Sequence, residues 1–216
     1  MIPDYMDTIV KHYETCLEKY GDTHLGVDWP KANDAIKRYK VMLDIIKFAG
    51  DTSKNNSLLD FGCGAAHLYQ YILEKGIGDI EYAGLDISEK FISLCKKKYP
   101  AITFYQIDIL EDKQQLPVFD YIVMNGVFTE KRELDFEEMW EYFCKMLVHI
   151  FSHCNRGIAF NVMSKEVEWE RADLFHVPTD KLVHFLTKNI SRNFMIRNDY
   201  GLYEYTVYVY KQKLNG

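Results

Sequence analysis

Three apolar runs of this chain each carry an acidic residue at or near the carboxyl end, and this pattern restricts the possible folds more than any other feature. The three residues are Asp60, Asp86 and Asp108. Asp60 is followed almost at once by two glycines, Gly62 and Gly64, with a single residue between them. A buried strand that leads into such glycines is typical of a tight turn beneath a nucleotide-like ligand. One Gly-x-Gly is common by chance, but three acidic strand ends in register predict a parallel sheet with a ligand site at its carboxyl edge.

Length, charge and hydropathy argue against several other classes of protein. The chain has 216 residues, which is enough for one compact domain with a full core. Its formal charge of −6 argues against a nucleic-acid backbone as the main partner. No apolar run approaches the ~18 residues of a membrane span, and the first residues lack the basic and apolar segments of a leader peptide. We therefore expect a cytoplasmic protein that does not act at a membrane.

The cysteines and histidines form no recognisable metal motif. The five cysteines are scattered, odd in number and without Cys-x-x-Cys spacing, which favours reduced thiols. His149 and His153 have the four-residue spacing of a metal-binding pair on a helix, but no third ligand follows nearby in the sequence. The sequence therefore predicts no metal site.

Helical and strand patterns divide the chain into two parts. Apolar residues recur at helical spacing through the first 50 residues, with a break at 21–30, which predicts a helical cap over 1–50. A polar linker then leads into alternating strands and helices, so that 51–216 is predicted to be the ligand-binding domain. The predicted strands are Leu58–Phe61, Ile80–Asp86, Ile102–Tyr105, Val118–Met124 and Gly157–Met163. The predicted helices are Leu68–Lys75, Glu89–Lys98, a long helix that starts at Asp135, and Lys181–Asn189.

The end of the chain departs from this alternation. Phe194–Asn198 and Tyr203–Lys211 have strand-like patterns but lie too close together in the sequence for a crossover helix. The two segments must therefore form an antiparallel hairpin. The sequence thus predicts an α/β fold with a mostly parallel sheet, helices on both faces, an antiparallel last strand and an N-terminal helical extension.

Over roughly residues 57–211, the chain resembles the class I S-adenosylmethionine-dependent methyltransferases. The resemblance rests on the terminal hairpin and on two motifs, Leu-Leu-Asp-Phe-Gly-Cys-Gly at 58–64 and Gly-Leu-Asp-Ile-Ser at 84–88. It implies a Rossmann-like, seven-stranded sheet, S-adenosyl-L-methionine as the cofactor, and methyltransferase activity (EC 2.1.1.-). A dinucleotide-dependent dehydrogenase is the alternative for the same glycines, and both the hairpin and the short glycine loop disfavour it.

The resemblance also implies roles for individual residues. Gly62 and Gly64 let the backbone approach the methionine part of the cofactor, where a Cβ would obstruct it. Asp60 orients this loop or receives the cofactor's ammonium group, and Asp86 accepts the ribose hydroxyls. Asp108 accepts from the exocyclic amine of adenine. The other expected contacts are Ile87 and Ile109 on the adenine ring, Asn125 beside the sulfonium methyl group, and Arg38 on the methionine carboxylate.

The acceptor half of the site is less well defined by the sequence. His176, between the fifth strand and the last helix, is the first candidate for a general base or an acceptor-positioning residue, and His67 after the glycine loop is the second. The segment after Asn125 lacks the two prolines of the family's amino-methylating nucleic-acid enzymes. We expect a small-molecule or glycan-like acceptor, with O-methylation favoured over N-methylation. A protein or RNA methyltransferase and a non-catalytic, cofactor-binding partner subunit are the alternatives, and the oligomeric state stays open.

Overall fold

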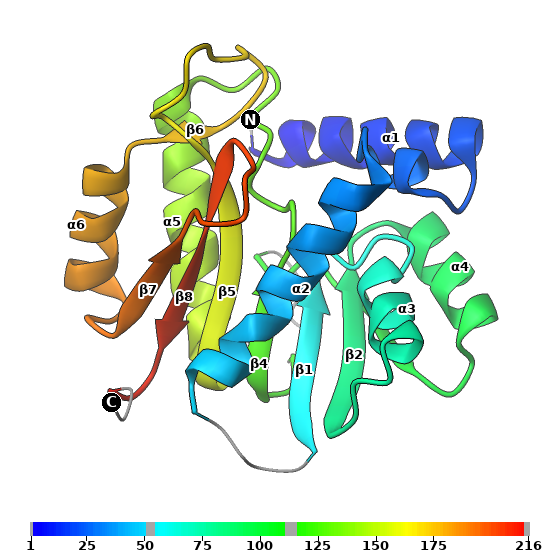
Figure 1. Ribbon diagram of the computed structural model, residues 1–216. Helices are drawn as coiled ribbons and strands as arrows, with labels where there is room; N and C mark the ends of the chain where they lie inside the picture. The colour runs from blue at the N-terminus through cyan, green and yellow to red at the C-terminus, as the bar shows by residue number, and fades with distance from the viewer. Residues whose placement is uncertain (1, 51–54, 111–115, 214–216) are drawn as a thin grey trace.

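A central β-sheet with helices on both faces forms the body of the protein (Figure 1). The computed structural model describes residues 2–50, 55–110 and 116–213, with side chains from residue 8 onward. The strands are β1 (Asn56–Phe61), β2 (Ile80–Asp86), β3 (Thr103–Gln106), β4 (Phe119–Met124), β5 (Cys154–Ser164), β6 (His176–Val177), β7 (Phe194–Arg197) and β8 (Glu204–Tyr210). The helices are α1 (Ile2–Tyr20), the 3-10 helix η1 (His24–Val27), α2 (Ala32–Phe48), α3 (His67–Glu74), α4 (Glu89–Lys98), α5 (Phe136–Ser152) and α6 (Thr179–Asn189).

The strand order explains where a ligand site can form. The sheet runs β3-β2-β1-β4-β5-β8-β7, with β6 paired to the end of β5. Strands β1 to β5 are parallel, whereas β8 is antiparallel to both β5 and β7. The order reverses between β1 and β4, and open sheets of this kind bind ligands at the carboxyl ends of the strands beside such a reversal. The predicted mixed sheet with an antiparallel terminal hairpin is confirmed.

Two layers of helices bury the sheet. Helices α5 and α6 cover one face, and α2, α3 and α4 cover the other (Figure 1). In β4, Ile122 and Met124 point into the core under α5, while Tyr121 and Val123 belong to the core on the opposite face. Because a central parallel strand is buried on both faces, β4 is an almost continuous apolar run instead of an alternating one.

Local capping groups fix the helices that border the carboxyl edge of the sheet. The Ser88 hydroxyl accepts a hydrogen bond from the Phe91 backbone N–H, so that α4 begins directly after β2. The Asp135 carboxylate accepts from the Glu138 N–H at 2.9 Å, and the Glu138 carboxylate accepts from the Asp135 N–H at 3.0 Å. This capping box starts α5 as the sequence predicts.

Two short elements were not predicted. Strand β6 contains only His176 and Val177 and brings the sheet to eight strands, where the resemblance implied seven. The 3-10 helix η1 lies within the segment expected to be a simple break. Both are too short to give a periodic pattern, because periodicity needs about two turns or four alternating residues. Of the polar linker, residues 51–54 lie outside the described part of the chain.

The first two helices differ in their relation to the sheet. Helix α2 contributes to the same core as β1, β4, β5 and β8, whereas α1 runs across the carboxyl ends of the strands (Figure 1). The division into a cap at 1–50 and a domain at 51–216 stays a prediction. None of the helices within the described ranges has the length and apolar character of a membrane span.

Candidate active site

A pocket opens at the carboxyl ends of β1, β2 and β4, beneath α1. The loops after β1, β2, β3 and β4 line it together with one face of α1 and one face of α5. The predicted cofactor residues in the lining are Asp60, Gly62, Gly64, Asp86, Ile87, Asp108, Ile109 and Asn125. The three acidic strand ends that are far apart in the sequence therefore surround one cavity, as parallel strand ends require.

The turn after β1 depends on glycine at two positions. Gly62 and Gly64 have φ values of +72° and +50°, which glycine adopts at little cost. A Cβ at Gly62 would also lie 2.7 Å from Cγ2 of Val127. The backbone N–H groups of Gly62 and Cys63 both donate to the Leu85 carbonyl, at 2.8 and 2.9 Å. These bonds hold the turn against the end of β2 and leave bare backbone as a wall of the pocket.

Asp86 connects the glycine turn to the start of α4. Its two carboxylate oxygens accept from the Gly64 N–H and from the Ser88 N–H, each at 2.9 Å. Burial raises the pKa of Asp86, and the N–H donors of Ser88 and Gly64 oppose that rise. Each carboxylate oxygen can accept more than one hydrogen bond. A pair of vicinal hydroxyls could therefore bind this carboxylate without breaking the contacts that fix it.

Asp60 is a buried carboxyl group whose ionisation is finely balanced. Its side chain accepts a hydrogen bond of 2.8 Å from the Tyr82 hydroxyl and is 3% exposed. The pKa of Asp60 is raised to about 7, because the rise caused by burial, together with a smaller one from the neighbouring Asp86, outweighs the lowering by the Tyr82 hydroxyl. A cation placed next to Asp60 in the pocket would favour its charged form. The site thus has a built-in preference for a positively charged group at this point.

The far end of the pocket combines a carboxylate with apolar surface. Asp108 follows β3 and accepts from the Leu110 N–H at 3.0 Å, while Ile109 is 7% exposed and Ile87 is half-buried. All three residues line the cavity. Aliphatic side chains around one acceptor group suit a flat heteroaromatic ring with a polar edge, because the ring faces need apolar contact and its amine needs an acceptor.

The loop after β4 carries a buried polar atom that lacks a partner. Oδ1 of Asn125 is buried and has no hydrogen-bond partner among the described residues. The adjacent Gly126 donates its N–H to Oδ1 of Asn161 at 2.8 Å and has a φ of +83°. A Cβ at Gly126 would lie 2.7 Å from the indole ring of Trp29. The loop is therefore fixed by glycine geometry, and Asn125 presents an acceptor to whatever occupies the pocket.

Arg38 corrects one of the sequence expectations. It does not belong to the pocket lining, and its guanidinium donates to both carboxylate oxygens of Glu204, with Nε–Oε1 at 2.9 Å and Nη2–Oε2 at 2.6 Å. Glu204 is 1% exposed and also accepts from Nδ2 of Asn161 at 3.0 Å. The arginine is thus committed to a buried carboxylate on β8, which the sequence pattern of α2 could not reveal. Because Asn161 holds Gly126, this chain of contacts supports the active-site loop from behind.

His176 corrects another expectation. It lies in β6, is 6% exposed and is absent from the pocket lining. Its Nδ1 lies 2.6 Å from the Ser164 carbonyl, so Nδ1 carries a proton, and its Nε2 accepts from the Arg171 N–H at 3.4 Å. Both ring nitrogens are used to join the β5 end to the following loop. In this structure His176 therefore joins two segments of the fold and lies outside the pocket.

His67 lies at the pocket, as expected of the second candidate. It begins α3 and lines the cavity, and its Nε2 lies 2.8 Å from Oδ1 of Asp22. Asp22 also forms an ion pair of 2.8 Å with Lys98. Burial lowers the pKa of His67, while Asp22 opposes that shift. A neutral imidazole that donates Nε2–H to Asp22 has its lone pair on Nδ1.

Several lining residues were not identified from the sequence. They include Ile9, Val10 and Tyr13 of α1, Val27 of η1, Tyr39 of α2, Glu130 in the loop after β4, and Met139, Tyr142 and Met146 of α5. The α1 residues recur at helical spacing and are half-buried, and the α5 residues are buried along one face of that helix. No local signal separates a stripe that faces a cavity from one that faces the core, since both have helical periodicity.

The donor set can be tested against the cofactor that the motifs imply. S-adenosylmethionine offers an ammonium group, two ribose hydroxyls and an adenine ring. The pocket offers a buried carboxyl with a raised pKa at Asp60, a carboxylate with spare acceptor capacity at Asp86, and an acid among aliphatic side chains at Asp108. Bare backbone at Gly62 and the orphaned acceptor of Asn125 complete the set. The residues present fit the group.

Comparisons with known proteins agree with this geometry. Residues 59–148 match the family model of a methyltransferase domain. A protein of Mycobacterium tuberculosis that is named as a methyltransferase is 24% identical over 157 residues, which cover 72% of this chain and 93% of that protein.

Solved structures have the same fold at low sequence identity. Magnesium protoporphyrin IX methyltransferase from Synechocystis PCC 6803, with bound S-adenosylhomocysteine, superposes with a TM-score of 0.66 at 16% identity and covers 95% of this chain and 100% of that chain. The plantazolicin methyltransferase BpumL, in complex with a desmethylplantazolicin analogue and S-adenosylhomocysteine, gives a TM-score of 0.64 at 13% identity, with 95% of each chain covered.

Proposed function

The chain belongs to the class I S-adenosylmethionine-dependent methyltransferases, and from that premise we propose that it methylates an oxygen atom of a small-molecule acceptor. The cofactor supplies an electrophilic methyl group, because the sulfonium is a good leaving group. The protein's contribution is then to bind both partners in line, exclude water and take up the acceptor's proton. In this proposal Asp60, Asp86 and Asp108 hold the cofactor, together with the glycine turn.

The mostly apolar side chains of the pocket wall support the proposed class of acceptor. Beyond the acidic cofactor residues, most of the described lining is aliphatic or aromatic, with Ile9, Tyr13, Val127, Met139 and Tyr142 among its members. Its other polar members include His67, Ser88, Asn125 and Glu130, and it includes neither lysine nor arginine. A polynucleotide acceptor needs cationic side chains along its backbone. An apolar wall under the cover of α1 favours a compact organic acceptor instead. A glycan is the second class of acceptor, and the acceptor assay below includes oligosaccharides to test it.

His67 is the residue that we propose as the general base. Asp22 accepts Nε2–H, orients the ring and leaves the Nδ1 lone pair available, while burial keeps the imidazole neutral near pH 7. A hydroxyl or carboxyl acceptor needs only one proton removed before or during attack on the methyl group. An amine acceptor already carries a lone pair when it is neutral, so the presence of a held base supports oxygen over nitrogen.

The names of the structural neighbours are compatible with this acceptor class. One acts on magnesium protoporphyrin IX and another on plantazolicin, and each superposes over most of this chain. At sequence identities of 16% and 13%, these similarities show a common fold and do not show a common substrate. The substrate of the present protein must therefore come from its own pocket and from direct assay.

A labelled-methyl assay tests the proposal. The purified protein is incubated with S-adenosylmethionine carrying a labelled methyl group and with panels of small hydroxyl, carboxyl and amine compounds, oligosaccharides, RNA and protein. We expect labelled product from a member of the small hydroxyl or carboxyl panels, and no transfer to RNA. Transfer confined to the RNA, protein or amine panels would contradict the proposal. Cofactor binding without transfer to any panel would favour the non-catalytic alternative.

The His67→Gln variant then tests the proposed base. We expect kcat to fall by about 10²–10⁴-fold with little change in the cofactor's Kd, because general-base catalysis contributes on that order. The matched control is His153→Gln, since His153 follows α5 and lies outside the pocket lining. A loss of less than about threefold in the His67→Gln variant would show that the acceptor is deprotonated by another route.

A further inference from the structure

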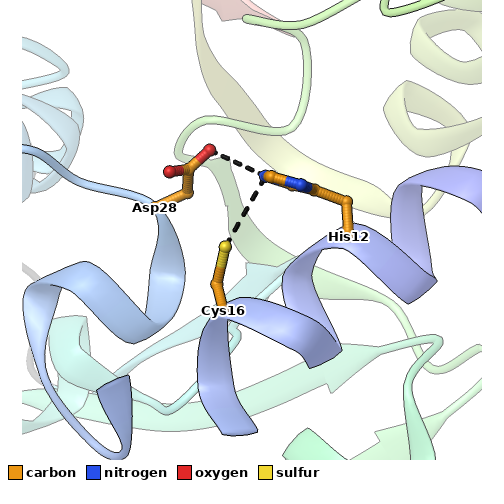
Figure 2. A group of neighbouring side chains, drawn as sticks. All are labelled: His12, Cys16 and Asp28. Atoms are coloured by element: carbon orange, nitrogen blue, oxygen red, sulfur yellow. Dashed lines mark hydrogen bonds and ion pairs between the residues drawn. The ribbon is translucent and has the colours of Figure 1, made fainter. Parts of the chain in front are cut away.

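Three side chains of types that bind metals meet beside the C-terminal half of α1, although the sequence did not predict a metal site. His12 and Cys16 lie four residues apart on α1 and so share a face of that helix. Asp28 follows η1 and directs its carboxylate at the same point (Figure 2). The possible ligand atoms of His12, Cys16 and Asp28 all lie within 4.8 Å of one another.

The backbone holds Asp28 in place for this contact. Asp28 has φ 57° and ψ 30°, a left-handed conformation that aspartate tolerates better than most residues. Its N–H donates to the Leu25 carbonyl at 3.1 Å, and the N–H of the next residue, Trp29, donates to the His24 carbonyl at 2.8 Å. The carboxylate is therefore delivered to α1 by an ordered turn.

The His12–Cys16 distance matches a tetrahedral zinc site, and the His12–Asp28 distance is slightly short for one. Nε2 of His12 lies 3.7 Å from Sγ of Cys16 and 2.8 Å from Oδ2 of Asp28. Metal bonds of about 2.0–2.1 Å to nitrogen, 2.3 Å to sulfur and 2.0–2.2 Å to oxygen place these pairs about 3.6 and 3.4 Å apart at tetrahedral angles. The His–Cys separation already matches. The His–Asp separation needs an increase of about half an ångström, which rotation of the carboxylate can supply.

Hydrogen bonds among these three side chains cannot satisfy all of their polar atoms at once, whereas a bound cation can. Both Cys16 and Asp28 approach the same nitrogen, Nε2 of His12 (Figure 2). A neutral imidazole nitrogen is either a donor or an acceptor. If it donates to Asp28, it cannot accept the Cys16 thiol proton, and if it accepts from Cys16, its lone pair faces the carboxylate. A divalent ion accepts a lone pair from all three atoms at once.

The charges around the cluster also suit a divalent cation. A Cys16 thiolate and the Asp28 carboxylate together would neutralise M²⁺, with His12 as a neutral ligand. Burial and the nearby Asp28 raise the pKa of the Cys16 thiol, so that a bound metal must displace that proton. The adjacent Arg132 and Glu130 form their own ion pair at 2.5 Å, and Arg132 lies 3.6 Å from Oδ2 of Asp28. Arg132 is thus the cation with which a metal would compete.

We propose that His12, Cys16 and Asp28 bind one divalent transition-metal ion, with zinc as the best match, and leave the fourth coordination position open. The donor set of one imidazole, one thiolate and one carboxylate suits a borderline-soft ion and disfavours Mg²⁺ and Ca²⁺, which select oxygen ligands. The site lies at the rim of the pocket, because Tyr13 next to His12 and Val27 and Trp29 on either side of Asp28 line the cavity. A bound ion would fasten α1 to the segment after η1 at that rim.

Titration of the metal-free protein with Co²⁺, followed by competition with Zn²⁺, tests this site. Co²⁺ bound to a thiolate gives a charge-transfer absorption that imidazole and carboxylate ligands alone do not give. We expect one equivalent to bind with that absorption, a Kd for zinc below about 10 µM, and Mg²⁺ unable to compete. The variants Cys16→Ser, His12→Gln and Asp28→Asn should each weaken binding by at least about tenfold, and Cys16→Ser should abolish the thiolate absorption.

Matched controls separate this site from adventitious binding. Cys144→Ser removes another half-buried thiol, and the double variant His149→Gln/His153→Gln removes a surface pair of histidines with the same four-residue spacing. Both should bind Co²⁺ as the wild type does, and circular dichroism verifies that every variant is folded. The proposal is overturned if the wild type binds no Co²⁺, if the thiolate absorption persists in Cys16→Ser, or if only the control variants lose the metal.

Discussion

Asp60 is the residue whose ionisation should report most directly on cofactor binding. Its pKa is raised to about 7 by burial, whereas a carboxylate in water titrates near 4. If Asp60 receives the cofactor's ammonium group, only its charged form binds well. We therefore expect the affinity for S-adenosylmethionine to fall about fivefold from pH 7 to pH 6 and about tenfold from pH 6 to pH 5. Above pH 8 the affinity should level off. Calorimetric titrations across this range measure the dependence.

Two variants assign that pH dependence to Asp60. Asp60→Asn cannot ionise and should remove the dependence, apart from any titration of the cofactor itself. Tyr82→Phe deletes the hydroxyl that lowers the pKa of Asp60, so the inflection should move to higher pH. A pH profile that is the same in all three proteins would show that Asp60 does not face a cation.

At the scale of elements, the contacts between α2, β5 and β8 explain why Arg38 lies where it does. Its guanidinium lies over the Trp29 ring at 4.2 Å and donates to both carboxylate oxygens of the buried Glu204, which also accepts from Asn161. Removing one member of a buried ion pair leaves the other charge uncompensated. Arg38→Met should therefore lower the free energy of unfolding by about 3–5 kcal/mol in urea denaturation.

Two comparisons test that assignment. Lys37→Met, on the same helix, removes an exposed ion pair with Asp34 and should change the free energy of unfolding by no more than about 1 kcal/mol. The double variant Arg38→Met/Glu204→Leu should be more stable than Arg38→Met, since it buries no lone charge. Equal losses in the Arg38→Met and Lys37→Met variants would contradict the view of this pair as a buried anchor.

Helix α1 should respond to the cofactor as an element. Its inner face lines the pocket through Ile9, Val10 and Tyr13, while its outer contacts to α4 consist of Glu14 with Ser88 and of Lys90 with two glutamates. Exposed ion pairs of this kind contribute little, so a ligand that contacts the inner face should add to the stability of the helix. We expect S-adenosylhomocysteine to slow amide hydrogen exchange across residues 8–20. Unchanged exchange there, with protection elsewhere in the pocket, would exclude α1 from the binding site.

The elements that the sequence predicted well are those with strong local signals. Ile80–Asp86 and Glu89–Lys98 match β2 and α4 at both ends, because an apolar run and the Ser88 cap define them. The hairpin was predictable from the short loop between its strands. Strand β6 was not, because its two residues belong to a strand only through pairing with the distant end of β5. Tertiary pairing of this kind leaves no periodic trace.

At the scale of the whole molecule, most residues expected to hold the cofactor line one pocket, whereas the first candidate for the acceptor half, His176, lies outside it. Backbone geometry and strand ends fix the positions of Gly62, Gly64 and Asp86, so their residue types show in the sequence. His176 and Arg38 lie outside the pocket lining, and the sequence could not indicate this because their partners, Ser164 and Glu204, approach from other elements. The cluster of His12, Cys16 and Asp28 escaped notice for the same reason, since η1 returns the chain to α1.

Cofactor binding should also stabilise the protein as a whole. A ligand at about 100 times its Kd adds about 2.7 kcal/mol to the free energy of unfolding. For a chain of this length, 1 kcal/mol corresponds to about 2–4 °C, so we expect Tm to rise by roughly 5–10 °C with saturating S-adenosylhomocysteine. Differential scanning calorimetry at several ligand concentrations measures the shift. A Tm that does not depend on ligand concentration would argue against a preformed site.

Isothermal titration calorimetry tests most directly whether the pocket at the ends of β1, β2 and β4 binds S-adenosylmethionine. We predict that the wild type binds S-adenosylmethionine and S-adenosylhomocysteine with one site each, and that Asp86→Asn weakens both by at least about tenfold through loss of a charged acceptor for the ribose. The surface variant Glu141→Ala, whose partner Lys145 is also exposed, should bind like the wild type. Binding of neither ligand at millimolar concentration, or an Asp86→Asn variant with an unchanged Kd, would contradict the account.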